Sequence, residues 1–151
     1  MFERGAGGEL ELRLGRDERA LLAGLAAELR AVLEGDPGDP SLRRLFPPAY
    51  EDEDDERGYR ELTGEGLLDG RREALALLAT TTDRERLSAE EAEAWLRALN
   101  DLRLVLGTRL DVQEDTFAEE LRPDDPRAPA LALYGYLSWI QERLVEALSP
   151  E

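Results

Sequence analysis

The segment 88–110 constrains the fold more than any other part of the chain. It begins with a capping box, in which the side chains of Ser88 and Glu91 accept hydrogen bonds from backbone N–H groups at the start of a helix. From Trp95 to Leu110, apolar residues then recur at helical spacing on more than one side. A helix over this segment is about 34 Å long. Because several of its sides need cover, we expect it at the centre of a helical bundle.

The composition supports a mainly helical chain. Leucine (29 residues) and alanine (19) far outnumber valine (4) and isoleucine (1). Leucine and alanine lose little entropy in a helix, whereas sheets are built mostly from β-branched and aromatic residues. We therefore predict a mainly α fold, a bundle of about five helices, with Thr63 as the N-cap of the third. The predicted helices cover residues 17–34, 51–62, 64–80, 88–110 and 130–148.

One segment near the start of the sequence has the period of a β-strand. Residues 9–14 alternate charged and apolar side chains, so that their three leucines share one face. Residues 2–4 are a short candidate partner strand, and the glycines between the two segments suit a hairpin turn. Because a lone hairpin is marginally stable in water, its leucine face is expected to pack against helices. The sequence thus predicts a single domain over 1–151, with a β-hairpin at 1–14 and a helical bundle over 17–148.

The residue types that the chain lacks exclude several kinds of chemistry. All 19 basic residues are arginine, and the sequence contains no lysine, histidine or cysteine. Disulfides and thiolate zinc sites need cysteine, imidazole catalysis needs histidine, and Schiff bases and P-loops need lysine. We therefore expect a non-enzymatic protein that requires no cofactor.

The net charge restricts the kind of partner. Thirty-five acidic residues against 19 basic ones give a net charge of −16 at pH 7. Binding to DNA or RNA depends on neutralising phosphates with cations, so we expect no direct contact with nucleic acid. An acidic protein attracts basic protein surfaces instead. The sequence shows neither the apolar core of a signal peptide nor roughly 20 apolar residues that span a bilayer, which predicts a cytoplasmic protein without membrane contact.

The acidic run 51–56 is the candidate for a metal site. Mg²⁺ and Ca²⁺ take carboxylate oxygens as ligands, so a carboxylate-dependent metalloenzyme that uses Asp54 and Asp55 is an alternative function. The run lacks the glycine and the spaced ligands of an EF-hand loop, and acids placed alternately on a helix point in different directions. We favour a solvated start of a helix, where carboxylates interact with the positive end of the helix dipole.

A polar cluster interrupts the central apolar helix. Asn100 and Asp101 are poor residues for a helix interior because their side chains compete for backbone hydrogen bonds. Among apolar neighbours they indicate a buried polar network, with Asp101 bound to an arginine. We favour a polar contact that sets the register of two helices, and a partner-binding or ligand-binding cluster is the alternative. The candidate residues are Asn100, Asp101, Arg103, Arg109, Arg71 and Arg72.

Three sequence motifs resemble a known family. They are LFPPAYEDED at 45–54, YRELT at 59–63 and WLRALNDLRLVLGTRLDV at 95–112. The motifs are similar to those of the actinobacterial AosR family, small helical domains of unknown function that include an oxidative stress regulator. The resemblance implies a regulator that binds a protein partner, a sigma factor or another RNA polymerase component.

The resemblance also suggests a second function and raises a difficulty. Genes of the family lie near that of the Clp adaptor ClpS, which implies an adaptor linked to Clp proteolysis as an alternative. Redox sensing in the oxidative stress regulator of the family depends on cysteines, and this sequence has none. Disulfide switching is therefore excluded within these 151 residues. The sequence also allows a homodimer, formed through the free edge of the hairpin or through an exposed leucine face, because unpaired strand edges invite pairing.

Overall fold

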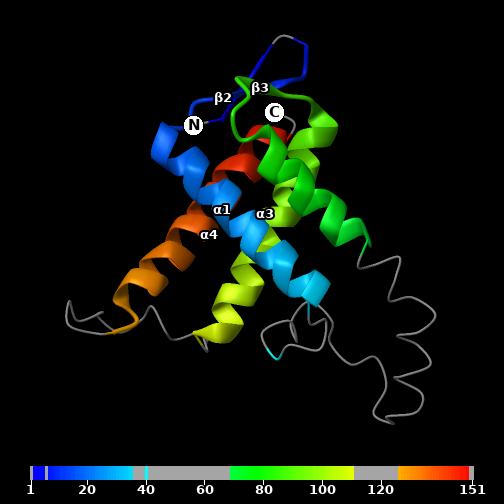
Figure 1. Cartoon of the computed structure of the whole chain (residues 1–151). Coiled ribbons are helices and arrows are strands. Elements are labelled where there is room, and N and C mark those ends of the chain that lie inside the picture. The colour runs from blue at the N-terminus through cyan, green and yellow to red at the C-terminus, as the bar shows by residue number, and fades with distance from the viewer. Residues whose placement is uncertain (1, 6, 36–39, 41–68, 111–125, 150–151) are drawn as a thin grey trace.

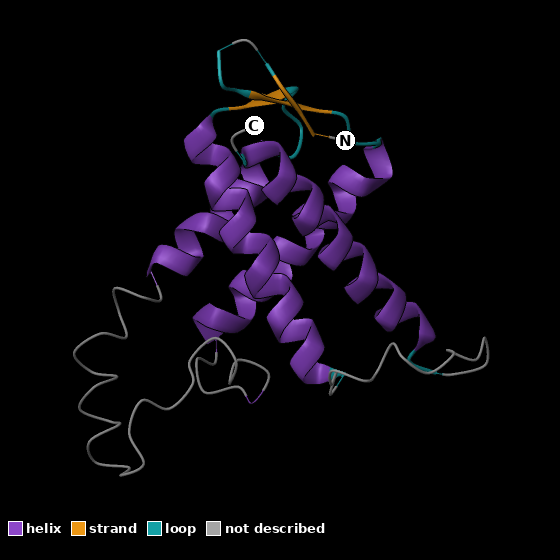
Figure 2. Ribbon diagram, turned by 180° about the vertical axis from the view of Figure 1, so that it is seen from behind, coloured by secondary structure: helices purple, strands orange, loops and turns teal. Residues whose placement is uncertain are grey.

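The computed structural model describes residues 2–5, 7–35, 40, 69–110 and 126–149. Within these ranges it contains four helices and a small antiparallel sheet of three strands. The helices cross one another as a bundle, and the sheet lies across one end of it (Figures 1 and 2). The predicted mainly α fold is thus confirmed.

Helix α3 (Ala89–Arg109) forms the centre of the bundle. Its predicted capping box is present: the Ser88 hydroxyl accepts a hydrogen bond from the Glu91 N–H (3.1 Å), and the Glu91 carboxylate accepts one from the Ser88 N–H (2.9 Å). The helix packs against α1 (Arg16–Gly35), α4 (Ala128–Leu148) and the last strand. Its buried residues lie on several sides: Ala92, Ala94, Trp95, Ala98, Leu99, Asp101, Leu102, Val105, Gly107 and Thr108. The predicted central position is confirmed.

The outer helices bury narrower faces. Helix α1 buries Leu22, Ala26, Leu29 and Leu33. Leu21, next to Leu22 in the sequence, is 40% exposed, so not every leucine of α1 belongs to the buried face. Helix α4 starts two residues before the predicted position, because Pro129 is tolerated in a first turn, where N–H groups have no acceptor within the helix.

The predicted hairpin is present and gains a third strand. Strand β1 (Phe2–Arg4) pairs with β2 (Leu10–Leu12), and β2 pairs on its other side with β3 (Arg86–Leu87). Gly8 adopts a φ of 84° in the turn, a conformation that glycine accepts without steric cost. The leucines of β2 are buried as predicted. The sequence predicts no strand at Arg86–Leu87, because two residues are too few to show a period.

One arginine joins the sheet to the helices. The guanidinium of Arg19, in the first turn of α1, donates hydrogen bonds to the carbonyl oxygens of Leu12 (3.2 Å), Leu14 (2.9 Å), Thr82 (2.8 Å) and Arg84 (2.6 Å). These carbonyls belong to the end of β2, to the connection after it and to the segment before β3. Arg19 therefore holds the two chain segments that meet at the sheet against the start of α1.

Four of the five predicted helices have counterparts within the described residues, and the second of these is helical over 69–81. The helix predicted over 51–62, the acidic run 51–56 and the predicted cap Thr63 lie outside the described residues.

Replacing each of the two tryptophans by alanine should lower the free energy of unfolding much more in the core than at the surface. Trp95 is fully buried, its indole N–H donates to the Thr81 hydroxyl (2.7 Å), and the Phe2 ring packs edge-on against it (6.4 Å between centroids). We expect Trp95→Ala to lower the free energy of unfolding by about 3–5 kcal/mol. The matched control, Trp139→Ala, removes a side chain of a residue that is 46% exposed and should cost less than about 1 kcal/mol. Urea unfolding followed by circular dichroism measures both, and equal losses would contradict the central position of α3.

Candidate functional site

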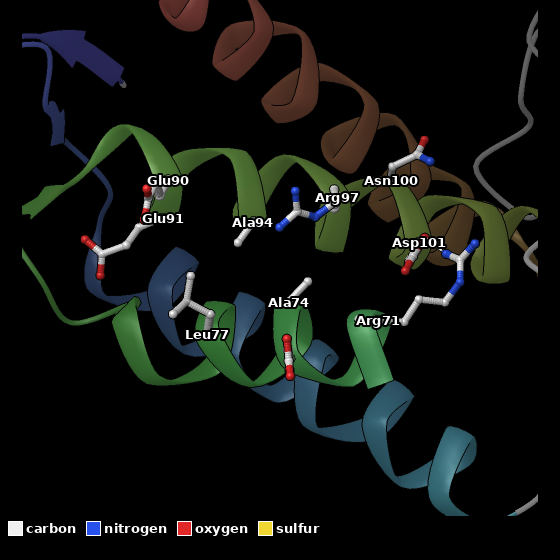
Figure 3. Close-up of a pocket in the computed structure, with 11 residues that line it drawn as sticks. Arg71, Ala74, Leu77, Glu90, Glu91, Ala94, Arg97, Asn100 and Asp101 are labelled. Atoms are coloured by element: carbon white, nitrogen blue, oxygen red, sulfur yellow. Dashed lines mark hydrogen bonds and ion pairs between the residues drawn. The ribbon is translucent and has the colours of Figure 1, made fainter. Parts of the chain in front are cut away.

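A pocket of about 680 Å³ lies between the helical residues 69–81 and α3 (Figure 3). Leu77 lies near the Glu90 end of α3 and Arg71 near its Asp101 end, so the two helices run in opposite directions. The pocket is lined by Gly70, Arg71, Glu73, Ala74, Leu77, Glu90, Glu91, Ala94, Arg97, Asn100 and Asp101. Three of the predicted candidate residues, Arg71, Asn100 and Asp101, are therefore in its wall.

The ion pair between Arg71 and Asp101 closes one end of the pocket. The Arg71 guanidinium donates a hydrogen bond through Nη1 to Asp101 Oδ1. Asp101 is buried, with 4% of its surface exposed, whereas the Arg71 side chain keeps 27%. Of the four arginines considered from the sequence, the structure thus pairs Asp101 with Arg71.

Burial raises the pKa of Asp101 above its ordinary value. Desolvation of the carboxylate is the largest cause, and it outweighs the hydrogen bond from Arg71 and the attraction of Arg71 and Arg97. At the other end of the pocket, the pKa of Glu91 is lowered, first by the hydrogen bond from the Ser88 N–H and also by Arg84. The pocket therefore has a carboxylate with a raised pKa at one end and a carboxylate with a lowered pKa at the other.

Three charged side chains of the pocket carry no ion pair or hydrogen bond with the described residues. They are Glu73 on the helical residues 69–81, and Glu90 and Arg97 on α3. All three are exposed. In Figure 3, Arg97 lies between the two helices, nearer to Asp101 than Glu90 is. The pocket thus presents charges of both signs that are available to a binding partner.

Asn100 contributes to a different contact on the other side of α3. Its Oδ1 accepts hydrogen bonds from Arg103 Nη2 (3.1 Å) and from Gln141 Nε2 (3.3 Å) of α4. Figure 3 shows the Asn100 side chain directed away from Arg71. The predicted polar cluster is therefore divided: Asp101 binds the helix before α3, and Asn100, which also accepts from Arg103 of its own helix, binds Gln141 of the helix after it.

The remaining two candidates lie outside the pocket. Arg72 forms an ion pair with Asp69 (3.6 Å) and donates to the Leu33 carbonyl oxygen at the end of α1 (3.5 Å). Arg109 is exposed and lines a smaller cavity of about 160 Å³ between α1, α3 and α4. Neither is near Asp101 in the contacts that the structure records.

The sequence contains a signal for the pocket that motif reasoning missed. Glu90, Ala94, Arg97 and Asp101 follow one another at intervals of four, three and four residues. Residues three and four apart share one face of a helix, so this stripe marks a mixed-charge face of α3. The facing helix and the connecting turn cannot be located from that spacing.

The chemistry available in the described residues is that of carboxylates and guanidinium groups. Among these residues, no three acidic side chains come close enough together to form a metal-ion site. Asp54 and Asp55, the acids of the metalloenzyme alternative, are outside the described ranges. In the part of the chain that the structure covers, no helix is both long and apolar enough to span a bilayer.

Comparison with known proteins gives a family and named relatives. A family model described as a domain of unknown function, DUF2017, matches residues 1–148. The oxidative stress regulator AosR of Mycobacterium tuberculosis is 36% identical over 130 residues, and the putative oxidative stress regulator AosR of Mycobacterium leprae is 32% identical. Each match covers 74% of this chain and 59% of the relative, so the chain spans less than two thirds of the relatives' length. No solved structure gives a significant match.

The raised pKa of Asp101 predicts a pH-dependent contribution to stability. A raised pKa means that the folded chain takes up this proton at a higher pH than the unfolded chain, so protonation favours folding. We expect the free energy of unfolding of the wild type to rise, relative to that of Asp101→Asn, as the pH falls from about 7 to about 4. Urea unfolding at several pH values measures this difference, in which the titration of the other acids cancels. A difference that falls with decreasing pH would contradict the assignment.

Proposed function

Because the chain belongs to the DUF2017 family, with AosR proteins among its relatives, we propose that it is a non-enzymatic regulatory protein. We propose further that it binds a basic protein partner, a sigma factor or another component of the transcription machinery. The observation that carries the proposal is the 36% identity to proteins named as oxidative stress regulators.

The charge of the chain supports a basic partner. A net charge of −16 gives long-range attraction to a basic protein surface and repulsion from nucleic acid. Glu73 and Glu90, which pair with none of the described residues, place part of that charge beside the apolar floor of the pocket. Contacts of this kind favour a protein surface that combines cations with apolar side chains. Because the proposed partner belongs to the transcription machinery, we propose that the protein acts in the cytoplasm.

The proposed regulation does not use a thiol switch within these residues. The 151 residues contain no cysteine, so they can form neither a disulfide nor a sulfenic acid on cysteine. A stress signal has to reach the complex in another way, through the partner or through the amount of either protein.

The regulatory role is testable in the host organism. We expect deletion of the gene to change the set of transcripts that responds to hydrogen peroxide, and a tagged copy to enrich a sigma factor or an RNA polymerase subunit about tenfold over an untagged strain. RNA sequencing and quantitative mass spectrometry measure the two effects. Unchanged transcripts together with no enriched transcription protein would contradict the proposal, and enrichment of a Clp ATPase or ClpS would favour the adaptor function.

The absence of thiols makes a second prediction. Pretreatment of this chain alone with diamide, an oxidant selective for thiols, should leave its affinity for the captured partner unchanged, because the chain has no group for diamide to oxidise. Surface plasmon resonance with the chain immobilised measures the affinity. A variant with one added cysteine at an exposed residue of α1 outside the pocket, Arg16→Cys, is the positive control for thiol modification. A loss of affinity in the cysteine-free chain would contradict the expected independence of thiols.

A further inference from the structure

The pocket between the helical residues 69–81 and α3 has charges of opposite sign at separate positions along one helix. Glu90 is in the first turn of α3 and Arg97 is seven residues further on. Neither side chain forms an ion pair or hydrogen bond with the described residues, although Arg97 attracts the Asp101 carboxylate at longer range. Glu90 therefore marks one end of the binding surface, and Arg97 is a basic position about one turn of α3 before the Arg71–Asp101 pair at the other end.

The floor between these positions is apolar, and two of its three residues are alanines with short side chains. Ala74 and Ala94 are buried, and Leu77 is half-buried. Figure 3 shows these three residues between the Glu90 end and the Arg71–Asp101 pair. Short floor residues let the backbone of a docked helix approach closely, as in helix pairs whose axes lie 8–10 Å apart.

The spacing of the two charges matches a helix. Seven residues correspond to about 10.5 Å along α3. In a partner helix that lies along the groove, residues i and i+7 are on one face and have the same separation. Residues i+3 and i+4 of that face are then opposite the alanine floor.

We propose that this groove binds an amphipathic helix of the partner that carries one basic and one acidic side chain seven residues apart, with large apolar side chains between them. The basic side chain pairs with Glu90 and the acidic one with Arg97. Glu73, on the facing helix, adds a second carboxylate to the surface. This inference rests on the proposed function, since it specifies the partner's chemistry at the site.

Two synthetic helical peptides, stapled on the opposite face and labelled with fluorescein, test the proposal. Both have leucine at i+3 and i+4 and lysine at i, and they differ at i+7, which is aspartate in the first and lysine in the second. We expect the full chain to bind the lysine–aspartate peptide about tenfold more tightly than the dilysine peptide in fluorescence anisotropy. Equal affinities, or no binding of either peptide, would overturn the proposal.

Charge reversal at one residue provides the decisive comparison. Arg97→Glu makes the groove negative at both position 90 and position 97, so the preference should reverse in favour of the dilysine peptide. Arg16→Glu is the matched control, because it changes the net charge equally at an exposed residue of α1 outside the groove. An unchanged preference in Arg97→Glu, or the same reversal in Arg16→Glu, would overturn the proposal.

The outcome separates this inference from the regulatory role. If a transcription protein is captured in the host and binds wild type and Arg97→Glu equally, the groove proposal is wrong and the regulatory role stands. If the peptides follow the expected preferences while deletion leaves the transcripts unchanged, the groove stands and the regulatory role is wrong. Circular dichroism of both variants confirms that a lost preference does not reflect unfolding.

Discussion

The burial of α3 on several sides is the constraint on which the rest of the structure depends. Trp95 and Leu99 have no exposed surface, and each apolar side chain removed from water contributes about 1.5–3 kcal/mol. A helix with such a surface is unstable unless other elements cover it. The remaining helices and the small sheet provide that cover, and Arg19 joins the sheet to the first of them through four carbonyl oxygens.

The polar residues of α3 add specificity to this packing. The pairing of Asp101 with Arg71 aligns α3 with the helical residues 69–81, while Asn100 aligns it with α4. Burial of the Asp101 carboxylate raises its pKa despite the ion pair with Arg71. A buried ion pair is weak evidence for added stability, and the role that the geometry of this pair supports is to fix the register of the two helices. Because it also closes the pocket, the same contact that sets the register defines one end of the candidate binding surface.

The function proposed for this chain depends on contacts and not on covalent chemistry. The named relatives are oxidative stress regulators, and the 151 residues of this chain contain no cysteine, so the proposed regulation does not use thiols within them. What the structure adds is a surface with exposed charges of both signs beside an apolar floor. Such a surface selects a partner by the arrangement of its charges, which gives more specificity than a uniform negative charge.

The sequence by itself determined the elements whose signals are local. The hydrophobic period and the capping box predicted α3 to within a residue, and the alternation of residues 9–14 predicted the hairpin, because such signals depend on neighbours within a few positions. It also marked Asn100 and Asp101 as unusual. Only the tertiary structure decided which arginine pairs with Asp101, that two residues form β3, and that Leu21 remains exposed. These outcomes depend on packing between segments distant in the chain, and the local period of a sequence carries no information on that packing.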